Sequence, residues 1–66
     1  MSITVNGEPR TLAAGTTVAD LLEQLGLANR PCAVEVNRRL VSKPRHGEHA
    51  LAPGDTVEIV TLVGGG

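Results

Sequence analysis

The segment TVADLLEQLG, residues 17–26, decides the fold of this 66-residue chain because it alone has a clear helical period. Four of its apolar side chains fall at i, i+3, i+4 and i+7 and so share one face of a helix: Val18, Leu21, Leu22 and Leu25. Acidic and amide side chains take the opposite side. A helix of about two turns is not stable alone in water. The stripe therefore predicts a helix that is buried against a sheet.

Both ends of this helix carry recognisable signals. Thr17 can cap the first turn with Asp20 three residues later, an aspartate variant of the capping box that also suits the positive end of the helix. Gly26 fits the cap at the other end. Together these signals predict a helix at about residues 18–25.

The residues before the helix predict a β-hairpin. Residues 2–5 alternate, with Ile3 and Val5 on one face. Asn6-Gly7 readily takes the positive φ angles of a tight turn, and residues 9–12 then form the return strand.

The residues after the helix predict further strands. Residues 32–36 alternate again, and 40–41 form a short strand. Residues 42–52 are expected to be irregular. A Pro-Gly-Asp turn at 53–55 precedes the strongest strand, residues 56–62, which is rich in β-branched residues.

This order of elements predicts an α+β fold, with a mixed four- to five-stranded sheet and one helix across one of its faces. The first and last strands should lie side by side and parallel. We expect a single domain over residues 1–62 and a flexible glycine tail at 63–66. The predicted core consists of Ile3, Val5, Leu12, Val18, Leu21, Leu22, Leu25, Val34, Val36, Val57 and Ile59.

Composition narrows the classes of function. One cysteine excludes an intramolecular disulfide, and the absence of Phe, Tyr and Trp removes stacking platforms for nucleobases. A net charge of −1 without a basic stripe argues against a nucleic-acid partner. The short apolar runs predict no membrane segment, and a cytoplasmic location is expected. So small a domain is not expected to enclose a substrate pocket, which argues against a free-standing enzyme.

Several segments together carry a resemblance that extends from end to end of the chain: ITVNG at 3–7, AGTTV at 14–18, VEVN at 34–37, PGDTVEIV at 53–60 and VGGG at 63–66. They resemble the ThiS family of small sulfur carriers, which has the ubiquitin-like β-grasp fold. The Gly-Asp turn before the last strand and the terminal glycines are the most specific parts.

The resemblance implies a chemistry at the C-terminus. An E1-like adenylyltransferase would use ATP to convert the Gly66 carboxylate into an acyl adenylate. A sulfur donor such as a cysteine desulfurase would then supply the sulfur of a thiocarboxylate, and thiazole synthase would take it for thiamine biosynthesis. Gly64 and Gly65 would thread through a narrow channel of the partner. The carrier would bind no cofactor or metal and hold no catalytic residue, acting as a co-substrate.

Two exposed aliphatic side chains suggest where such partners dock. Because a glutamate is rarely buried in so small a core, Glu58 is expected to point outward, so Val57 and Ile59 point inward, and Val60 and Leu62 share the outer face. With Val63 they form a candidate docking patch next to the tail. The alternatives are that a loop or the short strand covers them, or that they are scattered surface residues.

Other functions remain open from sequence alone. The carrier could serve molybdopterin formation or another sulfur-requiring pathway. It could also be a protein modifier joined through Gly66, or an interaction module whose glycine tail is inert.

The remaining polar features receive no specific role. Cys32 is expected to be a small core residue. His46 and His49 lack a third metal ligand and are expected at the surface. The basic cluster Arg38, Arg39, Lys43 and Arg45 either meets acids on a partner or is a solvated face.

Overall fold

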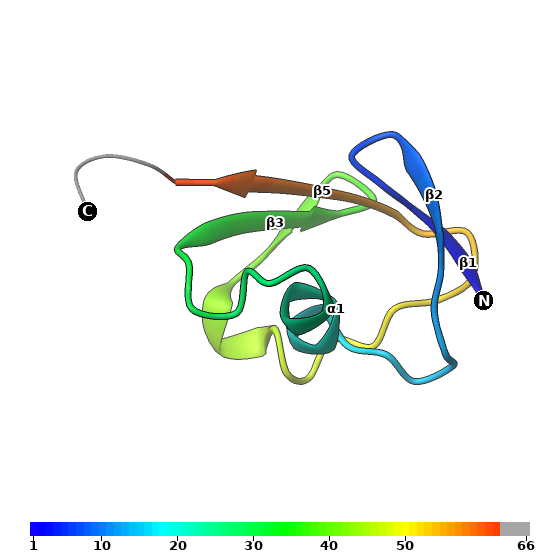
Figure 1. Cartoon of the computed structure of the whole chain (residues 1–66), viewed down its shortest axis with the longest axis horizontal. Helices are drawn as coiled ribbons and strands as arrows, with labels where there is room; N and C mark the ends of the chain where they lie inside the picture. The colour runs from blue at the N-terminus through cyan, green and yellow to red at the C-terminus, as the bar shows by residue number, and fades with distance from the viewer. Residues whose placement is uncertain (63–66) are drawn as a thin grey trace.

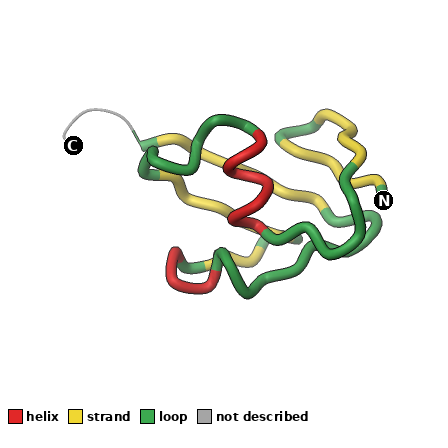
Figure 2. The backbone as a smooth tube through the Cα atoms, turned by 60° about the horizontal axis from the view of Figure 1, so that its bottom comes forward, coloured by secondary structure: helices red, strands yellow, loops and turns green. Residues whose placement is uncertain are grey.

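The computed structural model describes residues 1–62, which form a five-stranded sheet with one α-helix packed across one face (Figure 1). The strands are β1 (Ser2–Val5), β2 (Glu8–Thr11), β3 (Cys32–Val36), β4 (Arg39–Val41) and β5 (Thr56–Thr61). The helical elements are α1 (Val18–Gln24) and a single 3-10 turn, η1 (Lys43–Arg45). Figure 2 shows α1 lying over the strands, as the apolar stripe predicts.

The sheet is mixed and has the order β2-β1-β5-β3-β4, which places β5 at its centre. β1 pairs antiparallel with β2 and parallel with β5, where Thr4 lies opposite Thr56. β3 pairs antiparallel with both β5 and β4. The predicted parallel pairing of the first and last strands is therefore confirmed.

The N-terminus of α1 has the predicted capping box. The amide of Asp20 donates to Thr17 Oγ1 over 3.1 Å, and the amide of Thr17 donates to Asp20 Oδ2 over 3.0 Å. These reciprocal bonds satisfy two backbone donors that a helix end otherwise leaves free.

The C-terminus of α1 ends in a Schellman motif. Leu25 is the C-cap, and Gly26 follows with a φ of 74°, a conformation that costs glycine little. The amide of Gly26 donates to the Glu23 carbonyl over 3.0 Å, and that of Leu27 to the Leu22 carbonyl over 2.8 Å. The helix thus ends at Gln24, one residue before the predicted end.

The hydrophobic core lies between α1 and the sheet. Nine of the predicted core residues are buried: Ile3, Leu12, Val18, Leu21, Leu22, Val34, Val36, Val57 and Ile59. Val5 and Leu25 pack against this core but are only half-buried, because both line an open groove between α1 and β2. Val41 and Leu51 are buried core residues that the sequence reasoning did not include.

The segment 42–52 is more ordered than predicted, because it supplies hydrogen bonds to the start of α1. The amides of Val18 and Ala19 donate to the carbonyls of His49 and His46, each over 3.0 Å. The Leu51 amide donates to the Thr16 carbonyl over 2.9 Å, which brings the Leu51 side chain into the core.

The expected surface position of the histidines is wrong for His46, which is buried. Its Nε2 lies 3.0 Å from the Val41 carbonyl oxygen, within hydrogen-bonding distance. His46 is the C-cap of η1, directly after the turn, and His49 is half-buried in the same segment. Within residues 1–62 no three His, Cys, Asp or Glu side chains are grouped so that they could hold a metal ion.

In the same described range, no helix has the length and hydropathy needed to cross a membrane.

Candidate functional site on the outer face of the sheet

The outer face, which we define as the side of the sheet away from α1, displays the aliphatic side chains predicted on the last strand. Val57 and Ile59 of β5 are buried, whereas Val60 is 59% exposed and Leu62, just after the strand, is 57% exposed. The Leu62 amide donates to the Pro31 carbonyl over 2.9 Å, so the chain still follows the sheet at that point. The predicted outward direction of Val60 and Leu62 is confirmed.

A third aliphatic side chain on the outer face was missed by sequence reasoning. Leu40 of β4 is 70% exposed, more than either Val60 or Leu62. It lies opposite Glu35 of β3, and its neighbour Val41 is buried. The sequence signal was present, since a two-residue alternation that buries Val41 must turn Leu40 outward.

Asn6 fixes the second half of β5 where the strand has lost its β1 neighbour. The amide of Ile59 donates to Asn6 Oδ1 over 2.8 Å, and Asn6 Nδ2 donates to the Ile59 carbonyl over 3.1 Å. The Asn6 side chain thereby makes the two hydrogen bonds to the Ile59 backbone that a further residue of β1 would otherwise make. Sequence reasoning assigned Asn6 only to the hairpin turn, which it also forms, with a φ of 49°.

A second asparagine fixes the beginning of β5. The Thr56 amide donates to Asn37 Oδ1, and Asn37 Nδ2 donates to Asp55 Oδ1, each over 2.9 Å. The other oxygen of Asp55 accepts from the Ala52 amide over 2.8 Å. The Pro-Gly-Asp turn therefore does more than reverse the chain, because it joins β5 to the turn after β3.

The predicted reacting residue Gly66, the threading residues Gly64 and Gly65 and the docking residue Val63 lie outside the described residues. Cys32 lies opposite Thr61 at the end of β5 and is half-buried against the core, as expected for a small packing residue. The residues of the basic cluster are all exposed, on η1 and around the turn between β3 and β4, which leaves both interpretations of it open.

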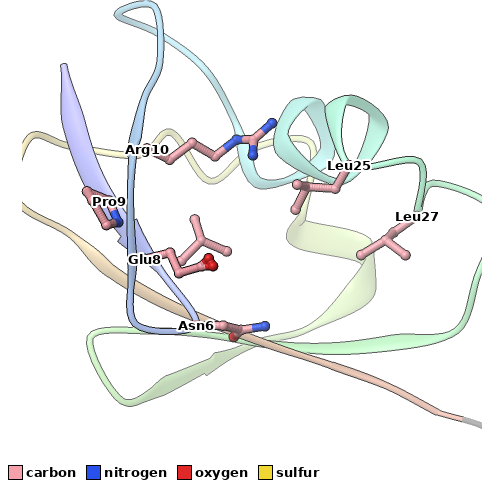
Figure 3. Close-up of a pocket in the computed structure, with 7 residues that line it drawn as sticks. Asn6, Glu8, Pro9, Arg10, Leu25 and Leu27 are labelled. Carbon is pink, nitrogen blue, oxygen red and sulfur yellow. The ribbon is translucent and has the colours of Figure 1, made fainter.

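An open groove of about 420 Å³ lies on the helix side of the sheet (Figure 3). Leu25 and Leu27 form its helix side, and Glu8 and Arg10 of β2 form much of the other. Val60 and Leu62 are not among the residues that line it, so it is separate from the outer face.

A comparison with protein families settles the relationship. The model of the ThiS family matches residues 3–66. The chain belongs to the ThiS family. The sulfur carrier protein ThiS of Escherichia coli is 32% identical over 66 residues, which is 100% of both chains. A crystal structure of the thiamine biosynthesis protein ThiS from Geobacter metallireducens superimposes with a TM-score of 0.84 and 33% identity over 100% of both chains.

Two thiazole synthases also contain a segment that matches this chain. A thiazole synthase from Magnetococcus marinus is 44% identical over 66 residues, which is 100% of this chain. The chain spans 20% of the length of the thiazole synthases that it matches. The resemblance to ThiS carriers and the β-grasp fold expected from the sequence are thus both confirmed.

Proposed function

We propose that this chain is a sulfur carrier of thiamine biosynthesis and acts as a protein co-substrate. The observation that carries the proposal is the match to the ThiS family over residues 3–66, which includes the terminal glycines as well as the folded domain. The full-length similarity to the sulfur carrier of Escherichia coli supports the same assignment.

In this proposal the Gly66 carboxylate is the reacting group. A carboxylate is a poor electrophile until one of its oxygens belongs to a good leaving group. Attack of a Gly66 oxygen on the α-phosphate of ATP, in the active site of an E1-like adenylyltransferase, releases pyrophosphate and forms the acyl adenylate. Sulfide then displaces AMP and leaves a thiocarboxylate. A persulfide, as a cysteine desulfurase would supply, displaces AMP to give an acyl disulfide, which a thiol reduces to the same product.

The folded domain holds and presents the tail in this scheme. Val60, Leu62 and Leu40 offer exposed apolar surface beside and along the strand that leads to residue 63, so a partner can bind the outer face while Gly64 and Gly65 enter its active site. Glycines suit this threading because a Cβ would widen the chain. Thiazole synthase, which we propose as the acceptor of the sulfur, would dock in the same region.

The experiment is an intact-mass measurement on the protein purified from its own host, before and after treatment with iodoacetamide. We expect a species with one oxygen replaced by sulfur, which iodoacetamide alkylates. The matched control is a variant that lacks Gly66, for which neither species should form. If sulfur is never found in a host that is making thiamine, the proposal is wrong.

A further inference from the structure

Two carboxylates face each other on the outer face of the sheet. Glu35 of β3 lies directly opposite Glu58 of β5 in the antiparallel register, and both side chains are exposed. Directly opposite residues point to the same side of a sheet, with Cβ atoms about 4.5–5.5 Å apart. Like charges at such a pair destabilise the sheet.

The strand positions that adjoin this acidic pair on the outer face carry no basic side chain. Across the sheet, Leu40 lies opposite Glu35 on the β4 side. Along β3, the next position on the same face is Ala33. Along β5, the next positions are Thr56 on one side of Glu58 and Val60, which lies opposite Ala33, on the other. Within the described strands, the positions that adjoin the pair on this face therefore hold apolar or neutral side chains.

The result is an acidic centre between apolar side chains. Leu40 lies on one side of the pair across the sheet, and Val60 lies next to Glu58 along β5. In Figure 1, α1 lies on the opposite side of β3 and β5 from this face. Lys43 and Arg45 belong to η1, in the segment that wraps the start of α1. Arg38 and Arg39 are exposed at the turn between β3 and β4, where Arg39 lies opposite the buried Val36.

We propose that the acidic pair Glu35–Glu58 is a docking site for an arginine of the adenylyltransferase, with Leu40 and Val60 as its apolar flanks. The inference rests on the proposed function, because it assumes that this enzyme binds the outer face. It goes beyond that function because it names the side chain, an arginine, that the enzyme places against Glu35 and Glu58.

Arginine fits this surface better than other side chains. Its planar guanidinium has five donors and can bond two carboxylates at once, which relieves the repulsion between Glu35 and Glu58. Its aliphatic stem can pack on Leu40 and Val60 while the charged head reaches the carboxylates. A metal ion is a poorer match, since within residues 1–62 no three suitable ligands are grouped together.

The test compares Glu58→Lys and Glu35→Lys with Glu23→Lys, which makes the same change of charge on the exposed side of α1. Dissociation constants for the cognate adenylyltransferase and for the thiazole synthase are measured by calorimetry at low and high salt. We expect each outer-face variant to weaken binding to the adenylyltransferase by about tenfold or more, and Glu23→Lys by less than about threefold. Wild-type binding should weaken with salt, and binding of the two outer-face variants should depend less on salt.

Folding is checked in the same samples. A Lys opposite a Glu replaces a repulsive pair with an attractive one, so the melting temperature of Glu58→Lys should equal or exceed that of the wild type. Glu58→Gln, which removes the charge without reversing it, should weaken binding to an intermediate degree.

Three outcomes would overturn the inference: unchanged binding of the outer-face variants, equal weakening by Glu23→Lys, or weakening confined to the thiazole synthase. The proposed function is judged separately, because the sulfur content of the native protein does not depend on these constants. A carrier that acquires sulfur but binds the enzyme independently of Glu35 and Glu58 would refute this inference alone.

Discussion

Replacing Asn6 with glycine removes the side chain that holds Ile59 and leaves the hairpin turn free to form. Glycine takes the φ of 49° found at this position without steric cost, so the backbone conformation is kept. Two hydrogen bonds of 2.8 and 3.1 Å are lost. At about 1 kcal/mol each, their loss lowers the free energy of unfolding by about 2 kcal/mol. For a domain of this size that corresponds to a melting temperature lower by about 8–16 °C.

The assay is thermal unfolding followed by far-UV circular dichroism, since the chain has no Trp, Tyr or Phe for fluorescence. Amide hydrogen exchange adds a local measurement. Protection of the Ile59 amide should fall more than that of the Val34 amide, because only the former donates to Asn6. The control is Asn29→Gly in the exposed loop before β3. A variant Asn6→Gly with wild-type stability and wild-type protection at Ile59 would refute this account of how β5 is held.

Three further changes test the core, the outer face and the tail. Leu21→Ala, at a fully buried position of α1, should lower the free energy of unfolding by about 2–5 kcal/mol in chemical denaturation; an unchanged midpoint would mean that α1 is not packed on the sheet. Val60→Asp should leave the melting temperature nearly unchanged, because the side chain is 59% exposed, yet weaken binding to the adenylyltransferase; unfolding of the variant, or unaltered binding, would contradict a docking role. Deleting Gly66 should preserve stability but abolish ATP–pyrophosphate exchange, because the new carboxylate falls short by about 3.5 Å; wild-type exchange would rule out the proposed reacting group.

The fold was predictable where local chemistry and periodicity agree. The stripe on α1, its Thr17–Asp20 box and the alternation of β5 each have a direct sequence signature, and each is present in the structure. Val41 and Leu51 were missed for different reasons. Val41 is buried because β4 pairs with β3, where Val41 lies opposite Val34, and the two-residue segment expected at 40–41 was too short to show this pairing. The burial of Leu51 depends on how the irregular segment around η1 wraps the start of α1, and no repeating pattern encodes that path.

The candidate site was predictable only within a single strand. Alternation along β5 was enough to place Val60 on the outer face. The pairing of Glu35 with Glu58 depends on the register between two strands that are distant in sequence, which a single sequence does not specify. The bond between Asn6 and Ile59 joins residues 53 positions apart, so it too follows from the tertiary structure. His46 was misplaced because a histidine near Pro44 and Gly47 looks like a loop residue until the Val41 carbonyl is seen beside it.

The central position of β5 has a consequence for how the protein is made. Of the five described strands, β5 is synthesised after the other four, yet it lies between β1 and β3 in the sheet. Contacts of such long sequence separation slow folding, because a large loop of chain must close before they form. A nascent chain that has not reached residue 56 holds the β1–β2 hairpin and the β3–β4 hairpin with no strand to join them. The sheet is therefore completed only when the strand that carries Val60, one of the proposed docking residues, has been synthesised.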